Sequence, residues 1–102
     1  MHKQQPKERG FSPWGEIQTV YEIAPGIVRV TTAGHGGLWV SPERLAAMPK
    51  RLKPKSPYHS GPPWFEEDCE WARVATAFPE AFSAKTQAAA AQTMRAYYPE
   101  DV

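Results

Sequence analysis

The chain has almost no cysteine and no long hydrophobic run. Cys69 is the single cysteine among 102 residues, which excludes an internal disulfide framework and a structural zinc site made mostly of cysteines. No segment approaches the roughly 20 apolar residues that cross a bilayer, and the polar N-terminus does not resemble a secretory signal peptide. These absences predict a cytoplasmic protein.

The signatures of several large functional classes are also missing. The sequence has no phosphate-binding P-loop, no Gly-x-Ser-x-Gly elbow and no His-Glu-x-x-His motif. It has no helix-turn-helix, zinc-finger or RNA-recognition pattern either. A chain of 102 residues forms one small core and leaves no room for a cofactor domain. We therefore expect no cofactor, a basic mobile arm over residues 1–10 and one domain over residues 11–102.

Proline and glycine are abundant instead, with 11 and 7 copies, and their positions divide the chain into elements. Pro25-Gly26 separates two runs rich in β-branched and aromatic residues, a pattern that predicts an antiparallel hairpin. The apolar run Leu38-Trp39-Val40 predicts a third strand. Ser41 followed by Pro42 predicts a short helix that ends before Pro49.

Two longer helices are expected in the second half of the chain. The first spans Trp64 to Phe78, with acidic residues at its positive end. The second begins after Ser83 as N-cap and ends before Pro99. Strands followed by helices predict an α+β fold, in which an N-terminal hairpin or three-stranded sheet packs against two or three C-terminal helices.

A histidine between glycines and a cluster of acids are the first candidates for chemistry. His35 lies in a Gly-His-Gly-Gly turn, where the glycines leave the imidazole unobstructed for proton transfer. The acids are Glu66, Glu67, Asp68 and Glu70. They can stabilise a helix N-terminus, act as acid and base, or hold a hard cation. A hydrolase-like or metal-assisted site requires His35, Glu67 and Asp68 to converge, and the sequence alone assigns neither a catalytic residue nor a metal ligand.

The proline-rich stretch over residues 50–63 is the next candidate, and we expect it to be a long loop. Its cations and aromatic rings are Lys50, Arg51, Lys53, Lys55, Tyr58 and His59. Cations interleaved with aromatic rings can hold phosphates and stack on a base, so nucleic-acid binding through residues 50–59 is one hypothesis. The other is contact with a partner protein or nucleoprotein complex, made by Tyr58 and the cations together with Glu66 and Glu70. Solvated loop charge remains the plainer explanation.

Several motifs, in their order along the chain, resemble a bacterial family of domains of unknown function, the one numbered 7007. The similar segments include Thr31-Thr-Ala-Gly-His35-Gly-Gly, Ser41-Pro-Glu-Arg and Trp64-Phe-Glu-Glu-Asp-Cys-Glu-Trp-Ala, and the resemblance covers roughly residues 14–99. It singles out His35, Gly36, Gly37, Trp64, Glu66, Glu67, Asp68 and Trp71. Phe65 stands where the family usually has tyrosine, which argues against a catalytic use of that position.

The resemblance indicates where a site lies rather than what it does, because no activity is established for the family. It also implies an origin in plasmids, prophages or other mobile elements, whose small proteins often act by binding host machinery. We therefore expect a protein-interaction module that inhibits a bacterial defence complex by direct binding, as anti-CRISPR proteins do, rather than an enzyme. The His35, Glu67 and Asp68 site and nucleic-acid binding are the alternatives, and the sequence predicts no oligomeric state.

Overall fold

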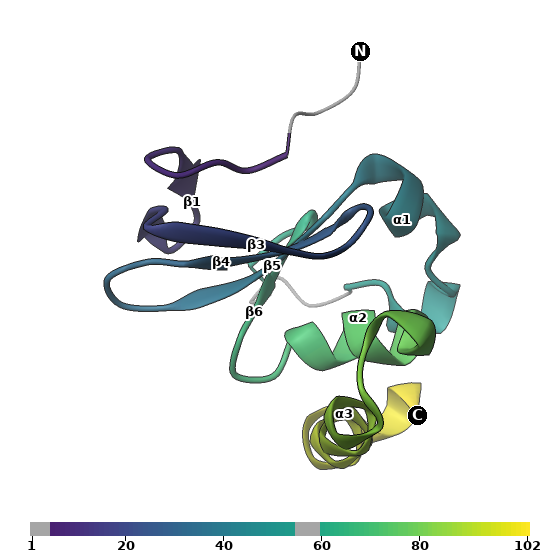
Figure 1. Ribbon diagram of the computed structural model, residues 1–102. Helices are drawn as coiled ribbons and strands as arrows, with labels where there is room; N and C mark the ends of the chain where they lie inside the picture. The colour runs from purple at the N-terminus through teal and green to yellow at the C-terminus, as the bar shows by residue number, and fades with distance from the viewer. Residues whose placement is uncertain (1–4, 55–59) are drawn as a thin grey trace.

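A computed structural model shows an α+β fold built on a four-stranded antiparallel sheet (Figure 1). The structure describes residues 5–54 and 60–102. The strands lie in the order β3-β4-β5-β6. They are β3 (Thr19–Ala24), β4 (Ile27–Thr31), β5 (Gly36–Val40) and β6 (Trp64–Glu66). The predicted fold class is confirmed, and β6 is a strand of this sheet that the sequence did not indicate.

The two longer helices cover one face of this sheet. The helices are α1 (Pro42–Ala47), α2 (Trp71–Ala77) and α3 (Ala84–Tyr97), with 3-10 turns η1 (Lys50–Leu52), η2 (Pro79–Ala81) and η3 (Pro99–Asp101). In Figure 1, α2 and α3 lie below the sheet and α1 lies beside it. None of the helices in the described part of the chain combines the length and the hydropathy needed to cross a bilayer.

Local sequence signals account for the hairpin and for two of the helix starts. Gly26 has a positive φ of 85° in the turn between β3 and β4, a conformation that glycine adopts without strain. The Ser41 hydroxyl accepts a hydrogen bond from the Arg44 N–H at 3.1 Å. The Ser83 hydroxyl does the same for the Thr86 N–H at 3.1 Å, so both predicted N-caps are confirmed.

The predicted helix from Trp64 to Phe78 is wrong in its first half. Trp64–Glu66 forms β6, which pairs with β5, and α2 begins only at Trp71. The pairing buries the Phe65 side chain completely, a gain that outweighs the weak local preference of a three-residue segment. The second half is confirmed, because α2 spans Trp71–Ala77 and buries Val74 and Ala75 in the core.

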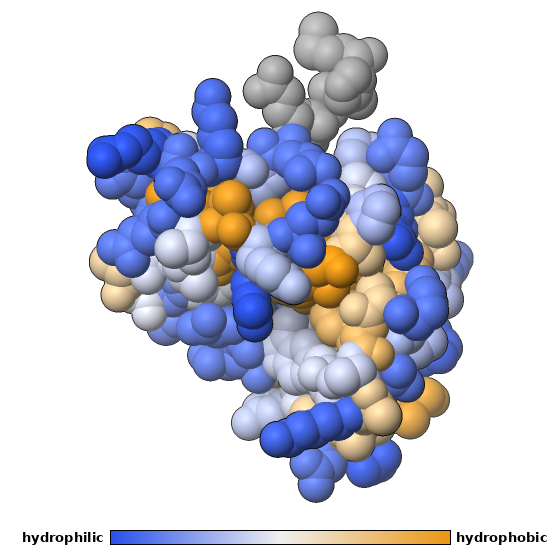
Figure 2. Space-filling view, viewed as in Figure 1, coloured by the Kyte–Doolittle hydropathy of each residue, from blue (hydrophilic) through white to orange (hydrophobic). Residues whose placement is uncertain are grey.

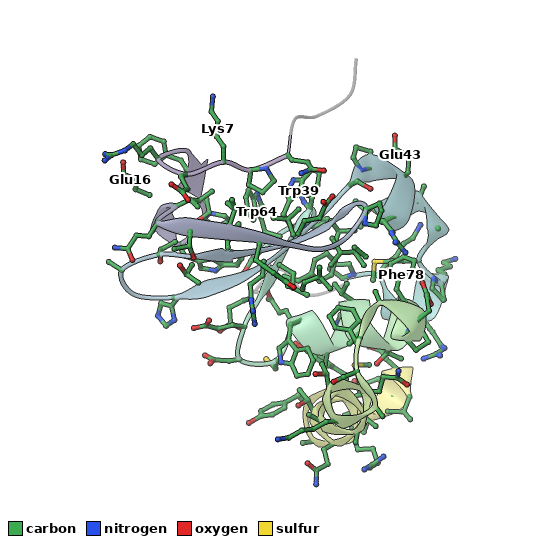
Figure 3. All side chains as sticks on the ribbon, viewed as in Figure 1. Lys7, Glu16, Trp39, Glu43, Trp64 and Phe78 are labelled. Atoms are coloured by element: carbon green, nitrogen blue, oxygen red, sulfur yellow. The ribbon has the colours of Figure 1, made fainter. Side chains whose placement is uncertain are left out.

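Each face of the sheet has its own hydrophobic cluster. On the helix side, Leu38 and Phe65 pack with residues of α2 and α3. On the other side, an N-terminal segment containing the short strands β1 (Phe11–Ser12) and β2 (Gly15–Glu16) packs over Trp39 and Trp64. Figure 3 shows these two tryptophans on the side of the N-terminal segment and Phe78 on the helix side. The sheet is therefore covered on both faces.

Residues at the end of the predicted mobile arm belong to this N-terminal cover. The Arg9 N–H donates to the Ile17 carbonyl oxygen at 2.8 Å, and the Ile17 N–H donates to the Gly10 carbonyl oxygen at 2.8 Å. The Trp14 ring then meets the Trp64 ring edge to face, with centroids 5.6 Å apart. The N-terminal segment is thus joined to β6 as well as to itself.

A buried ion pair attaches the C-terminus to the helical layer. The Arg73 guanidinium in α2 lies 2.9 Å from the Asp101 carboxylate, and both side chains are buried. The same guanidinium stacks over the Tyr98 ring at 4.0 Å, and the Arg51 side chain donates to the Asp101 carbonyl oxygen at 2.6 Å. These contacts join η1, α2 and η3, so the order of the helical layer depends on groups close to the chain end.

Gly37 in β5 permits an unusually close approach of β6. A Cβ atom at this position would lie 2.3 Å from the Phe65 carbonyl oxygen and 2.6 Å from a ring carbon of Trp14. Both distances are far below van der Waals contact, and the first involves a backbone atom that cannot rotate away. Only glycine fits here without moving β6 or the N-terminal cover.

We expect Gly37→Ala to lower the free energy of unfolding by about 2 kcal/mol or more, the usual cost of forcing an extra group into a packed site. Gly34→Ala is the matched control, because a Cβ atom at Gly34 meets nothing within 4 Å. Chemical denaturation of both variants measures the difference. Equal midpoints for the two variants would show that β6 moves aside at no cost.

Candidate functional site

The pairing of β5 with β6 brings the histidine turn and the acidic segment together. Gly37 lies opposite Glu66 in the register, and the Glu67 N–H donates to the Gly36 carbonyl oxygen at 3.0 Å. His35 directly precedes β5, and Asp68 follows β6 by two residues. Segments thirty residues apart in the sequence are therefore neighbours at one end of the sheet.

Three side chains converge at this end. His35, Glu66 and Asp68 each offer one atom that can bind a metal ion, and these three atoms lie within 4.8 Å of one another. His35 and Asp68 are exposed and Glu66 is half-buried. The structure thus places His35 beside Asp68, as the hypothesis of a chemical site requires, but the third member of the cluster is Glu66 rather than Glu67.

The side chain of Glu67 lies toward the helix side of the sheet instead. Its Oε1 atom is 3.1 Å from the position that a Cβ atom at Gly36 would occupy, and it lines a groove together with Leu38 and Trp71. Successive residues of an extended strand point to opposite faces. The side chains of Glu66 and Glu67 at the end of β6 therefore lie on two different surfaces.

The backbone holds His35 in place while its ring stays exposed. The Thr32 N–H donates to the His35 carbonyl oxygen at 3.0 Å. The Thr32 hydroxyl accepts from the His35 N–H at 3.2 Å and also contacts the His35 carbonyl oxygen. No described residue forms a hydrogen bond with the imidazole ring, so both ring nitrogens are available to a ligand from solvent.

Glu66 and Asp68 interact directly. Burial raises the pKa of the Glu66 carboxyl above its usual value, and a hydrogen bond with the Asp68 side chain raises this pKa further. The Cys69 N–H partly opposes the shift by donating to Glu66 Oε1 at 3.3 Å. Two carboxylates this close repel each other when both are ionised, so a shared proton or a cation between them stabilises the pair.

Glu70 has a different place from the other acids. Its side chain is 7% exposed, and its carboxylate accepts from the Glu66 N–H at 2.8 Å and from the Ser60 N–H at 3.0 Å. The contact with a partner that the sequence predicts for Glu66 and Glu70 stays a prediction. The Glu70 carboxylate is bonded inside the protein, so Glu66 exposes more of its side chain for such a contact.

The basic loop is described only in part. Lys55, Tyr58 and His59 lie outside the described residues. Lys50 and Arg51 are exposed in η1 and Lys53 is half-buried, while the Arg51 guanidinium is already bonded to the C-terminal turn. Nucleic-acid binding through residues 50–59 stays a prediction.

The groove beside Glu67 is a candidate that the sequence did not indicate. It has a volume of about 410 Å³ and lies between the sheet and the α2–α3 connection. Its lining includes Ile23, Arg29, Leu38, Glu67, Trp71 and Phe82. Figure 2 shows hydrophobic side chains near the middle of this face, with hydrophilic ones around them. These residues come from separate elements, so no sequence motif could have revealed the groove.

We expect Glu70→Ala to lower the free energy of unfolding by about 1–3 kcal/mol, because it removes the acceptor of two backbone N–H groups near the site. Amide hydrogen exchange at Ser60 and Glu66 should become faster. Glu70→Gln, which keeps one acceptor oxygen, should lose less. Unchanged exchange rates at both amides in Glu70→Ala would refute this role.

The comparison with known families agrees with the ordered motifs in the sequence. The model of the family described as Domain of unknown function (DUF7007) matches residues 7–102. No curated protein and no solved structure gives a match. The match includes the histidine turn, β6 and the whole helical layer. The chain therefore belongs to the DUF7007 family of domains of unknown function.

Proposed function

We propose that this protein acts by binding an extended segment of a partner protein in the groove between the sheet and the α2–α3 connection. The groove itself carries the proposal. Its volume of about 410 Å³ lies within the range of known ligand sites, and its apolar lining comes from both layers of the fold. A single apolar side chain of the partner would be buried against Leu38, Trp71 and Phe82.

The charges in the lining define the chemistry of the bound segment. Arg29 and Glu67 both line the groove, and both side chains are exposed. The Arg29 guanidinium lies over the Tyr21 ring at 5.6 Å, a contact that leaves its N–H groups free to bind a carboxylate. We therefore expect the segment to carry an acidic residue for Arg29 and a basic residue for Glu67 beside its apolar side chain.

The family resemblance suggests a bacterial defence complex as the partner. The more specific proposal is that this protein inhibits the complex by binding it, as anti-CRISPR proteins do. The exposed cation Lys50 would then add a contact outside the groove and accelerate association through its charge. This role requires binding alone, with no reaction at the groove.

Selection from a displayed library of random heptapeptides tests the proposal. The wild-type protein should enrich peptides that join an aromatic or large aliphatic residue to an acidic one. Arg29→Glu should reverse the charge preference and weaken binding of the best wild-type peptide about tenfold or more, because a like charge then faces its carboxylate. Isothermal titration with the synthesised peptide measures the affinity.

Arg95→Glu is the matched control for charge reversal. Arg95 is exposed on α3 and lines a different pocket, so this variant should keep the wild-type preference. Enrichment of the same peptides by wild type and Arg29→Glu would exclude the groove as the binding surface. Failure of the wild type to enrich any sequence would contradict the proposal as a whole.

A further inference from the structure

We propose that His35, Glu66 and Asp68 form a binding site for a divalent cation of the zinc and manganese class. The proposal goes beyond partner binding and concerns a separate place in the fold. It rests on one imidazole and two carboxylates whose ligand-capable atoms lie within 4.8 Å of one another. The imidazole comes from the turn before β5, and the carboxylates come from β6 and the turn after it.

The distances suit a single ion. Ligand atoms that bind one tetrahedral Zn²⁺ at about 2.0–2.2 Å lie about 3.4 Å apart. The three atoms lie within 4.8 Å of one another, so they must move closer by up to about 1.4 Å when an ion binds. The side chains of His35 and Asp68 are exposed, which leaves them room to rotate toward the ion.

The backbone positions these ligands before an ion arrives. The antiparallel pairing of Gly37 with Glu66 fixes the spacing of the two segments, and hydrogen bonds with Thr32 hold the backbone of His35. Glu66 lies on a paired strand, and His35 and Asp68 lie in turns that adjoin the two paired strands, so the site loses less conformational entropy on binding than one on free loops. The Cys69 N–H further orients the Glu66 carboxylate through Oε1 at 3.3 Å.

Electrostatics favour the ion as well. Glu66 and Asp68 each place a carboxylate oxygen within 4.8 Å of the other, so their negative charges repel when both are ionised. A divalent cation between them replaces this repulsion with two attractive contacts. The exposed His35 ring adds an imidazole nitrogen as the third ligand.

The donor set selects the class of cation. Imidazole nitrogen suits zinc and other transition metals, whereas Mg²⁺ and Ca²⁺ prefer oxygen ligands only. One nitrogen with two carboxylates therefore favours Zn²⁺ or Mn²⁺ over Ca²⁺. Three protein ligands leave at least one coordination position for water or for a group of a bound partner, which is the arrangement of an open metal site.

Isothermal titration of the chelator-treated 102-residue chain with ZnCl₂ and with MnCl₂ tests the site. We expect one ion per chain and a higher thermal midpoint when the ion is bound. His35→Ala and Asp68→Asn should each weaken the affinity at least tenfold, because each removes one of three ligands. Glu67→Gln is the matched control and should change the affinity less than twofold, since its carboxylate lies on the other side of the sheet.

A second measurement distinguishes the loss of a metal ligand from the loss of the fold. In proton NMR, stoichiometric Zn²⁺ should shift the His35 ring resonances of the wild type, and His59→Ala should leave this shift unchanged. Asp68→Asn alters an exposed side chain and should remain folded even if His35→Ala does not. Absence of binding at millimolar zinc or manganese, or equal affinity of the wild type and Asp68→Asn, would overturn the proposal.

Discussion

The close contact between β5 and β6 is the constraint on which the rest of this structure depends. It exists because Gly37 has no side chain where the Phe65 carbonyl oxygen and the Trp14 ring approach. Through this contact the core gains Phe65 on one face and the Trp14–Trp64 ring pair on the other. The same contact holds the histidine turn beside the acidic segment. Stability and the candidate site therefore share one structural cause.

Two neighbouring residues at the end of β6 belong to two different surfaces. Glu66 joins His35 and Asp68 in the cluster suited to a cation, whereas Glu67 lines the groove proposed for a partner segment. The buried Glu70 carboxylate accepts a hydrogen bond from the Glu66 N–H. This contact fixes the backbone of Glu66 and so helps to position its carboxylate.

The helical layer depends on a second, different kind of interaction. The buried pair of Arg73 and Asp101 stabilises the layer only as a pair, because one charge left alone in the interior would be costly. It joins α2 to the C-terminal turn, while Ala90 and Met94 of α3 pack into the same core. Trp71 of α2 and Thr86 of α3 line the groove, so both helices contribute to its walls together with the sheet.

The sequence by itself determined the elements whose signals are local. Pro25-Gly26 specifies a hairpin turn, and Ser41 and Ser83 cap helices, because each acts on atoms a few residues away. Only the tertiary structure decided that Trp64–Glu66 is a strand, since its hydrogen-bond partner is β5, far along the chain. For the same reason the sequence could group His35, Glu67 and Asp68 only as a hypothesis, whereas the structure brings Glu66 beside His35 and Asp68. The choice between Glu66 and Glu67 depends on the register of a strand that local patterns do not reveal.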